Sequence, residues 1–488
     1  MSTVRSSIVY SSLNSWSTVV FQLASTVVLA RILTPEQTGI FAVAAVFAAL
    51  ASTFRDFGVG EYLIQEKNLT PDVIRAALTV NIATSWAMGA LLFVLAPIAG
   101  SFYAAAGVTD VMRVQAVNFL LIPFGAVTMA WFRREMNFKP ILVVGLVANG
   151  CAFVVAIIMA LRGFGFMSLA WSSLVGTVLT VAGSVWVRPA GFPKWPGLRG
   201  VSHVVHFGKF ASGIYIFGQL GKGAPEMILG RALNMSAVGM FSRASGLIEI
   251  FNRLVLRAVH PVCLPYFSNS VRQEGTPVRG MLVTMSYLTV IGWTFLGFMA
   301  VAAFSAVRLL YGRQWMEAIS LAQILCAAAA FELLYCMSKE AMLSLGKAKE
   351  SNLLQMATEG LRILGLLAVI PFGLEGACWG LLAAAALGAV VAHLTLRAHI
   401  GLQARDVGKA VWPSLCVAGL AGLPMFAWTR WMPITEGNYL RVAVAGAIVT
   451  TVLWFVCLRA LRHPLWLEVQ SASAGAMRKF VSFRSSDR

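Results

Sequence analysis

Apolar segments of about 20 residues or more follow one another along almost the whole chain, with short polar connections between them. This is the length that a helix needs to cross the apolar core of a bilayer. The pattern therefore predicts an all-α polytopic membrane protein with about 14 transmembrane helices. The expected spans are 10–31, 39–60, 75–99, 112–132, 141–161, 167–187, 204–230, 236–258, 281–307, 319–343, 352–371, 376–396, 410–430 and 440–460.

A repeated sequence pattern relates the first six spans to the next six. Leu29, Arg31, Leu33, Gly39, Phe41 and Ala44 match Leu229, Arg231, Leu233, Gly239, Phe241 and Ala244, at an offset of 200. Phe164, Gly165, Trp171 and Leu174 match Phe372, Gly373, Trp379 and Leu382, at an offset of 208. We interpret the repeat as two homologous six-helix lobes. Because each lobe has an even number of spans, the two lobes should be related by an axis along the membrane normal.

The span pattern and the repeat together predict the domain organisation. We expect an N-lobe over 1–187, a cytoplasmic interlobe linker over 188–203, a C-lobe over 204–400, a further helix pair within 401–462 and a basic tail over 463–488. The linker combines Pro and Gly with basic residues and contains Trp195. Such a segment is expected to lie on the lipid headgroups, where a Trp side chain is an anchor.

Composition and charge agree with a membrane protein. Hydrophobic residues make up 58% of the chain and charged residues only 12%, whereas soluble proteins have about 25% charged residues. The net charge of +18 arises mainly from Lys and Arg in alternate connections, which predicts that both termini are cytoplasmic. The basic excess therefore gives no reason to expect a nucleic-acid partner. The cysteines and histidines show no metal-ligand spacing, so we expect no metal and no cofactor.

Ionisable residues inside the predicted spans are concentrated in the second half of the chain. Each costs about 3 kcal/mol to insert, so each should face a cavity or a partner. They are Lys222, Glu226, Arg243, Glu249, Glu332, Glu359 and Arg362. Residues three or four apart can neutralise each other on one helix face, and this interpretation stays open for Lys222 with Glu226, Glu359 with Arg362, and Glu249 with Arg253.

Arginines at the span ends make the balance of these charges positive. Arg binds phosphate through two parallel hydrogen bonds, so an anionic headgroup such as pyrophosphate would be held by several of them. The candidates for a pyrophosphate and sugar chamber are Arg31, Arg55, Lys222, Arg243, Arg253, Arg257 and Arg362. The candidates for ion coupling are Glu226, Glu249, Glu332 and Glu359, with H⁺, Na⁺ and uncoupled transport all left open.

Several short stretches resemble motifs of bacterial polysaccharide flippases and occur in the same order. They are 29–41 (LARILTPEQTGIF), 54–60 (FRDFGVG), 69–71 (LTP), 133–136 (RREM), 239–244 (GMFSRA) and 261–268 (PVCLPYFS). The similarity extends to about residue 400. The chain thus resembles the Wzx-type, lipid-linked oligosaccharide flippases in the polysaccharide transporter branch of the multidrug/oligosaccharidyl-lipid/polysaccharide exporter superfamily.

This resemblance implies a function and a fold. The function is translocation of undecaprenyl-pyrophosphate-linked oligosaccharide repeat units across the bacterial inner membrane, for exopolysaccharide, O-antigen or capsule biosynthesis. The fold is two six-helix lobes that form a V-shaped, alternating-access chamber. The last two spans are similar in layout to the extra pair of lipid II flippases, which lines a groove for the lipid tail. A polymerase and a chain-length regulator are partners by analogy, and membrane lipids surround the protein.

Two alternative functions remain. A drug/cation antiporter of the same superfamily should have a carboxylate in its first span, and residues 10–30 contain none. A membrane polysaccharide polymerase or glycosyltransferase typically has a large outside loop with catalytic residues, whereas the outside loops here are short. We therefore expect a transporter and not an enzyme.

Overall fold

A computed structural model describes residues 2–56, 58–432 and 434–471 of the chain. Every regular element in these ranges is a helix. The chain divides into two compact units, the first made of residues 1–242 with 310–315, and the second of 243–309 with the described chain from 316 onward. The expected lobes, linker and helix pair were defined from the sequence repeat and stay a prediction.

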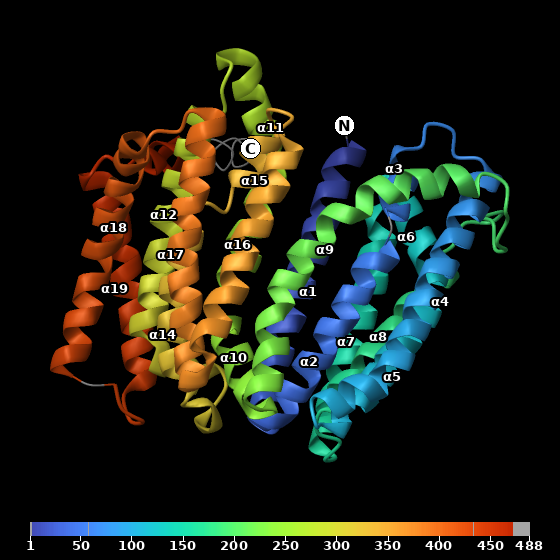
Figure 1. The fold of residues 1–488 in the computed structure, drawn as a ribbon, viewed down its shortest axis with the longest axis horizontal. Coiled ribbons are helices and arrows are strands. Elements are labelled where there is room, and N and C mark those ends of the chain that lie inside the picture. The colour runs from blue at the N-terminus through green and yellow to red at the C-terminus, as the bar shows by residue number, and fades with distance from the viewer. Residues whose placement is uncertain (1, 57, 433, 472–488) are drawn as a thin grey trace, which may run out of the picture. The chain divides into compact units, whose positions relative to one another are not determined.

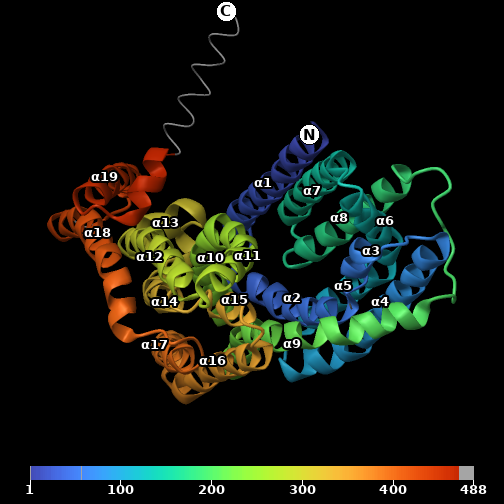
Figure 2. The same cartoon turned by 90° about the horizontal axis from the view of Figure 1, so that it is seen from above.

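The first unit contains nine helices and the first turns of a tenth (Figures 1 and 2). They are α1 (Ser2–Ile32), α2 (Pro35–Asp56), α3 (Val59–Gln65), α4 (Pro71–Phe102), α5 (Ala106–Leu121), α6 (Pro123–Arg134), α7 (Phe138–Leu161), α8 (Met167–Trp186), α9 (Val201–Ala232) and the start of α10 (Met235–Phe251). Within this unit α1 packs on α7, α7 on α8, and α2 on α4, α5 and α9. Of these packed helices, α1, α2, α4, α7 and α8 line the candidate site.

The second unit contains the remaining helices. They are the rest of α10, the π-helical turn η1 (Asn252–Leu256), α11 (Arg257–Glu274), α12 (Val278–Val301), α13 (Ala303–Leu310), α14 (Ala318–Glu332), α15 (Ser338–Leu343), α16 (Ala348–Val369), η3 (Ile370–Phe372), α17 (Gly373–Ile400), α18 (Ala404–Trp431) and α19 (Tyr439–Ala460). The short helix η2 (Arg313–Trp315), between α13 and α14, belongs to the first unit. Here α12 packs on α18 and α14, and α17 on α14 and α16.

The length and composition of the helices confirm a multi-pass membrane protein. In the described ranges nine helical segments are long and apolar enough to span a bilayer, and α5 with α6 would be a tenth if this bent pair is one span. One of the nine segments, Ala348–Ile400, contains both α16 and α17. Every expected span contains helical structure, but the one expected at 319–343 is broken between α14 and α15 by a turn over 333–337. The number of helices that cross the membrane stays a prediction.

Several expected spans are interrupted. The span expected at 112–132 consists of α5 and α6, which meet at an angle of 55°. Pro123 begins α6, and a proline inside a helix removes one hydrogen bond and clashes with the preceding turn. The span expected at 39–60 ends at Asp56, and Gly58 has a positive φ of 65° before α3 begins. The span expected at 236–258 contains the π-helical turn η1.

The repeated glycines Gly39 and Gly239 lie in a reciprocal close contact between α2 and the first turns of α10. A Cβ atom on Gly39 would stand 1.8 Å from the carbonyl oxygen of Met235. A Cβ atom on Gly239 would stand 2.0 Å from the carbonyl oxygen of Pro35. Each helix therefore approaches the other's backbone at a place where only glycine fits.

The segment between α13 and α14 caps the C-terminal end of α1. The Trp315 indole Nε1 donates a hydrogen bond of 2.7 Å to the carbonyl oxygen of Ala30, and Gln314 Nε2 donates one of 2.9 Å to that of Leu33. The last carbonyls of a helix have no partner inside the helix, so side chains from elsewhere stabilise the end. Trp315 is fully buried. These contacts explain why residues 310–315 belong to the first unit.

The connection between α8 and α9 is held against the first unit. Thr79 Oγ1 donates to the carbonyl oxygen of Gly197 at 2.7 Å, and the amide of Gly197 lies 2.9 Å from the same hydroxyl. Arg188 Nε donates to Thr128 Oγ1 at 3.0 Å, and its burial lowers the pKa of the guanidinium from its ordinary value. Trp195 is 79% exposed, as an interfacial anchor would be.

The chain after α19 folds back onto the second unit through His463. Its Nε2 lies 3.1 Å from both Ser286 Oγ and Ser414 Oγ, and its Nδ1 accepts the amide hydrogen of Leu465 at 3.2 Å. Because Nδ1 accepts, the neutral ring carries its hydrogen on Nε2 and donates it to a serine. Burial lowers the pKa of His463 to about 4. The expected basic tail thus begins with a packed segment, and its residues 472–488 lie outside the described ranges.

Candidate functional site

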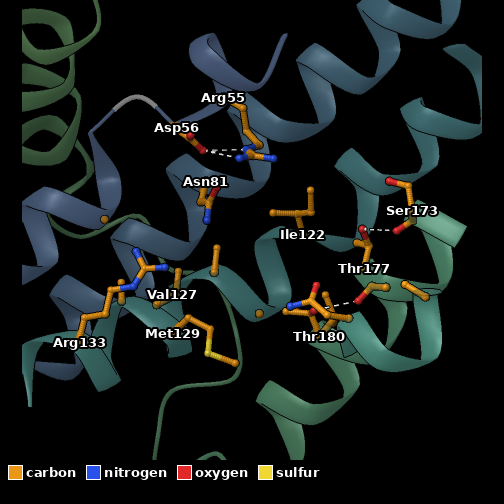
Figure 3. Close-up of a pocket in the computed structure, with 18 of the residues that line it drawn as sticks. Arg55, Asp56, Asn81, Ile122, Val127, Met129, Arg133, Ser173, Thr177 and Thr180 are labelled. Carbon is orange, nitrogen blue, oxygen red and sulfur yellow. Dashed lines mark hydrogen bonds and ion pairs between the residues drawn. The ribbon is translucent and has the colours of Figure 1, made fainter. Parts of the chain in front are cut away.

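A cavity of about 840 Å³ lies within the first unit (Figure 3). Its lining comes from α1, α2, α3, α4, α6, α7 and α8. A polar cavity among apolar helices is unusual, because polar side chains in a membrane protein normally need partners within the protein or water. The cavity is therefore the candidate site of this unit.

One wall of the cavity is a row of hydroxyl groups on α8. Ser173 and Thr177 are one helical turn apart, as are Ser172, Gly176 and Thr180, so both rows lie on the same face. Thr177 Oγ1 donates to the carbonyl oxygen of Ser173 at 3.0 Å, and Thr180 Oγ1 to that of Gly176 at 2.8 Å. Since the protons of these two hydroxyls go to the helix itself, their lone pairs remain for a ligand in the cavity.

Amide side chains from other helices complete the neutral lining. Asn81 on α4 is almost fully buried, and its Oδ1 accepts a hydrogen bond of 3.3 Å from Ser85. Asn149 on α7 donates to Thr18 Oγ1 at 3.4 Å, and Gln22 on α1 also lines the cavity. Because each amide has both a donor and an acceptor end, it can bind a hydroxyl group in either role.

Aromatic rings stand between the polar groups. Phe21 on α1 and Phe153 on α7 both line the cavity, and their ring centroids are 6.2 Å apart. Phe41 on α2 is a further lining residue. The cavity thus combines aromatic surface with hydroxyl and amide groups, which is the usual composition of a site for a polar organic ligand.

Two of the charged residues of the cavity form an ion pair. Arg55 Nε and Nη2 both donate to Asp56 Oδ1, at 2.9 and 2.5 Å (Figure 3). The Arg55 guanidinium carbon also lies 5.5 Å from the centroid of the Phe119 ring, in cation–π range. The carboxylate of Asp56 offsets the charge of Arg55, so this arginine contributes little net positive charge to the cavity.

The adjacent residues Arg133 and Arg134 have different roles. Arg133 lines the cavity and is exposed, and it forms no hydrogen bond or ion pair with the described residues. Arg134 instead donates to the carbonyl oxygens of Leu63, at 2.7 Å, and of Glu66, which fixes the end of α3. The backbone amide of Asn68 donates to the Glu66 carboxylate and lowers its pKa from the ordinary value. One arginine is thus structural and the other is available to a ligand.

Of the residues predicted for the chamber, Arg55 lines the cavity. Arg31 lies at the exposed end of α1, and Lys222 and Glu226 lie on α9, where Lys222 is exposed. The other candidates belong to the second unit.

In the second unit Glu249 is the centre of one group of candidates. Its Oε1 accepts hydrogen bonds from Arg253 Nε at 3.1 Å and from Arg257 Nη2 at 3.2 Å, across the π-helical turn η1. The expected pairing of Glu249 with Arg253 is therefore present. Arg243 lies two helical turns earlier on α10.

Glu332, Glu359 and Arg362 form a second group. Glu359 Oε2 lies 3.6 Å from Arg362 Nη1, the pairing expected from their spacing. Tyr335 lies within electrostatic range of all three residues. Tyr335 lies three residues after Glu332, and the fold brings the ion pair of α16 to the same tyrosine. The structure thus groups candidates that are far apart in the chain.

Comparison with known proteins decides the family. The sequence profile described as "polysaccharide biosynthesis protein" matches residues 28–320, more than half of the chain. The chain belongs to this family. The match includes all the cavity-lining residues except Phe21, Gln22 and Ser25 of α1, which precede it.

Curated relatives of the chain are named for polysaccharide pathways. The succinoglycan biosynthesis transport protein ExoT of Rhizobium meliloti is 25% identical over 65% of this chain and 64% of its own length. The teichuronic acid biosynthesis protein TuaB of Bacillus subtilis is 22% identical over 70% and 71%. The lipopolysaccharide biosynthesis protein WzxC of Escherichia coli is 23% identical over 62% of each. The chain thus spans slightly less than two thirds of ExoT and WzxC.

Solved structures share the fold. The lipid II flippase MurJ in an inward closed conformation matches with a TM-score of 0.71 at 13% identity, over 93% of this chain and 99% of that one. An inward-facing multidrug resistance MATE transporter matches with a TM-score of 0.59 at 15% identity, over 81% and 98%. At this level of identity the two matches concern the fold alone.

The hydroxyl wall of this family member was not predicted from the sequence. Ser and Thr in an apolar helix commonly bond to their own backbone, so Thr177 and Thr180 did not stand out. The available signal was their spacing: Thr177 lies four residues after Ser173, and Thr180 lies eight residues, or about two helical turns, after Ser172. A search for neutral polar residues on one helix face, besides charged ones, would have found them.

Proposed function

We propose that this protein is a flippase that moves undecaprenyl-pyrophosphate-linked oligosaccharide repeat units across the bacterial inner membrane, and that it is not an enzyme. The observation that carries the proposal is the polar cavity of about 840 Å³ among apolar helices. A lipid-linked oligosaccharide has a polar head that cannot cross the bilayer core unaided and a tail that is soluble in it. A polar cavity within a lipid-embedded bundle suits such a molecule.

The expected architecture is part of the proposal. Two six-helix lobes, 1–187 and 204–400, would form a V-shaped chamber that opens alternately to the two sides, with the linker 188–203 and both termini in the cytoplasm. The helix pair within 401–462 would guide the lipid tail. The likeness of the fold to MurJ and the printed names of ExoT and WzxC support this proposal.

The headgroup contacts are assigned to the chamber arginines. We propose that Arg31, Arg243 and the cluster of Arg253 and Arg257 contact the pyrophosphate, because arginine binds phosphate oxygens in pairs. Glu249 between the last two arginines is a candidate for a protonation switch. Lys222 and Arg362 are further candidates for the headgroup, and Glu226, Glu332 and Glu359 for ion coupling. A polymerase and a chain-length regulator would act on the exported product.

Conditional depletion of the protein tests the function. Undecaprenyl-linked lipids would be extracted and analysed by mass spectrometry, from sealed inverted and right-side-out membrane vesicles. Completed oligosaccharide pyrophosphoryl lipids should accumulate in the cytoplasmic leaflet while the surface polymer disappears. If these lipids still reach the periplasmic leaflet but stay unpolymerised, the protein acts after translocation, and the polymerase alternative would replace the proposal.

A substitution tests the headgroup assignment. Arg243→Ala should abolish the surface polysaccharide without lowering the amount of protein in the membrane. Arg272→Ala is the matched control, because Arg272 is an exposed arginine near the end of α11. A normal amount of polymer in Arg243→Ala would show that Arg243 does not hold the headgroup.

A further inference from the structure

We propose that the cavity of the first unit binds uncharged sugar residues of the oligosaccharide and does not bind the pyrophosphate. This inference rests on the proposed function and assigns one part of the substrate to one site. The uncharged groups in the lining that can recognise a ligand are five hydroxyl, three amide and three aromatic side chains, set among aliphatic residues. The hydroxyl and amide groups can form hydrogen bonds with sugar hydroxyls, and the aromatic rings can pack against the faces of a sugar ring.

The charges of the lining exclude a strong anion site. Four charged residues line the cavity, the cations Arg55 and Arg133 and the carboxylates Asp56 and Glu61. Their formal charges cancel, and Arg55 already donates two hydrogen bonds to Asp56. A pyrophosphate is bound by an excess of cationic donors. Two carboxylates in the lining would repel it.

The hydroxyl row on α8 fits an array of sugar hydroxyls. Thr177 and Thr180 donate to their own helix, at 3.0 and 2.8 Å, and so act as acceptors toward the cavity. A sugar hydroxyl both donates and accepts, so it can donate to these oxygens. Across the cavity, Asn81, Asn149 and Gln22 can donate to or accept from the same ligand. Helices α1, α4, α7 and α8 thus present complementary groups to one space.

The aromatic residues fit the remaining surface of a sugar. The faces of a sugar ring carry C–H groups and are apolar, and aromatic rings pack against such faces. Phe21 and Phe153 lie at the same part of the lining, with centroids 6.2 Å apart. The volume of about 840 Å³ lies within the range of about 300–1,000 Å³ that is typical of ligand sites. It leaves room for a few sugar residues.

The main alternative is that these residues serve helix packing alone. Small hydroxyl residues allow close approach of helices in membranes, and Gly176 is packed in this way, since a Cβ atom there would meet the Ala152 side chain at 3.3 Å. Packing alone does not explain why Ser173, Thr177 and Thr180 face an open space shared with three amides. A site for a polyhydroxyl ligand explains the hydroxyl groups and the amides that line this space.

Cysteine protection tests which part of the substrate enters the cavity. In the purified full-length protein, Thr177→Cys would be labelled with a small water-soluble maleimide, and the added mass would be compared with that of the wild type. The probes are the free oligosaccharide released from the lipid carrier by mild acid, and farnesyl pyrophosphate. Ser202→Cys is the control, because Ser202 is exposed at the start of α9 and does not line the cavity.

The free oligosaccharide should slow the labelling of Thr177→Cys and leave that of Ser202→Cys unchanged, and farnesyl pyrophosphate should slow neither. Protection by farnesyl pyrophosphate alone would assign the cavity to the headgroup and overturn the inference. Protection by neither probe would also overturn it. The proposed function would still stand in both cases if depletion of the protein retains lipid-linked oligosaccharide in the cytoplasmic leaflet.

A hydroxyl deletion gives a second, independent measurement. Thr177→Val keeps the shape of the side chain and removes the acceptor, and Thr53→Val removes a similar back-bonded hydroxyl that does not line the cavity. In reconstituted vesicles the half-saturating concentration of lipid-linked oligosaccharide should rise about five- to tenfold for Thr177→Val, the effect of one lost hydrogen bond. It should not change for Thr53→Val. Equal values for the two variants would contradict a sugar contact at Thr177.

Discussion

The contact between Gly39 and Gly239 allows a sharp prediction about stability. In Gly39→Ala the new Cβ atom would stand 1.8 Å from the carbonyl oxygen of Met235, whereas ordinary van der Waals contact begins at 3.4 Å. In Gly239→Ala it would stand 2.0 Å from the carbonyl oxygen of Pro35. Both obstacles are backbone atoms, which cannot rotate away as a side chain would, so α2 and α10 must separate by about 1.5 Å. Overpacking of this kind costs about 1–3 kcal/mol or more.

The helix preference of alanine opposes this cost only in part, since alanine stabilises a helix by about 0.5–1 kcal/mol relative to glycine. Gly297→Ala on α12 is the matched control, because a Cβ atom there would meet no atom within 4 Å other than the neighbouring backbone of its own helix. We expect thermal unfolding in detergent, followed by size-exclusion chromatography, to show a lower melting temperature for Gly39→Ala and Gly239→Ala. Gly297→Ala should melt at the wild-type temperature or slightly above. An unchanged melting temperature for Gly39→Ala would refute the close contact.

Three further predictions concern single side chains. Arg134→Gln should lower the melting temperature, because each lost charge-assisted hydrogen bond costs about 1.5–3 kcal/mol. Arg133→Gln should lower transport in vesicles and leave the melting temperature unchanged. A lower melting temperature for Arg133→Gln with an unchanged one for Arg134→Gln would contradict these roles. Gln314→Ala should cost about 1 kcal/mol by exposing the end of α1, and unchanged melting would contradict the cap. For His463 the folded pKa of about 4 lies below the ordinary 6.5. The stabilisation of the folded protein by the neutral imidazole is therefore complete above pH 6.5 and is lost as the pH falls toward 4. By pH 5 the loss is about 2 kcal/mol, and His463→Gln should remove this part of the pH dependence of melting; an identical pH profile would refute it.

The sequence predicted the helices well because the bilayer sets a strict requirement on length and apolarity. Each expected span contains helical structure, although the span at 319–343 is broken by a turn over 333–337. Helices are expected because an apolar segment in lipid must satisfy its backbone hydrogen bonds internally. The breaks were less predictable. Pro123 and Gly58 were visible in the sequence, but the π-helical turn at Asn252–Leu256 has no comparable local signal and depends on packing around it.

The candidate site was predicted only in part. A single sequence shows which residues are costly to place in a membrane, but it does not show where they lie in the fold. Charged residues such as Arg55 are easy to identify as candidates, because an ionisable group in lipid is costly unless it faces a partner or a water-filled cavity. Whether it faces a cavity, or is offset by Asp56 as observed here, depends on the fold. Neutral residues such as Thr177 cost little in a helix, so their importance emerges only when several helices bring them to one space. The approach of Glu359 and Arg362 to Tyr335 likewise depends on tertiary packing.

The most direct test of the account is reconstitution of the purified protein alone into liposomes that contain lipid-linked oligosaccharide in both leaflets. The sugars of the outer leaflet would be oxidised by membrane-impermeant periodate, and the intact lipid that remains would be followed over time by mass spectrometry. The account predicts that nearly all of the lipid is consumed in liposomes with the protein and about half in liposomes without it. Consumption that stops at the same level in both preparations would contradict the claim that this chain moves lipid-linked oligosaccharide across a bilayer.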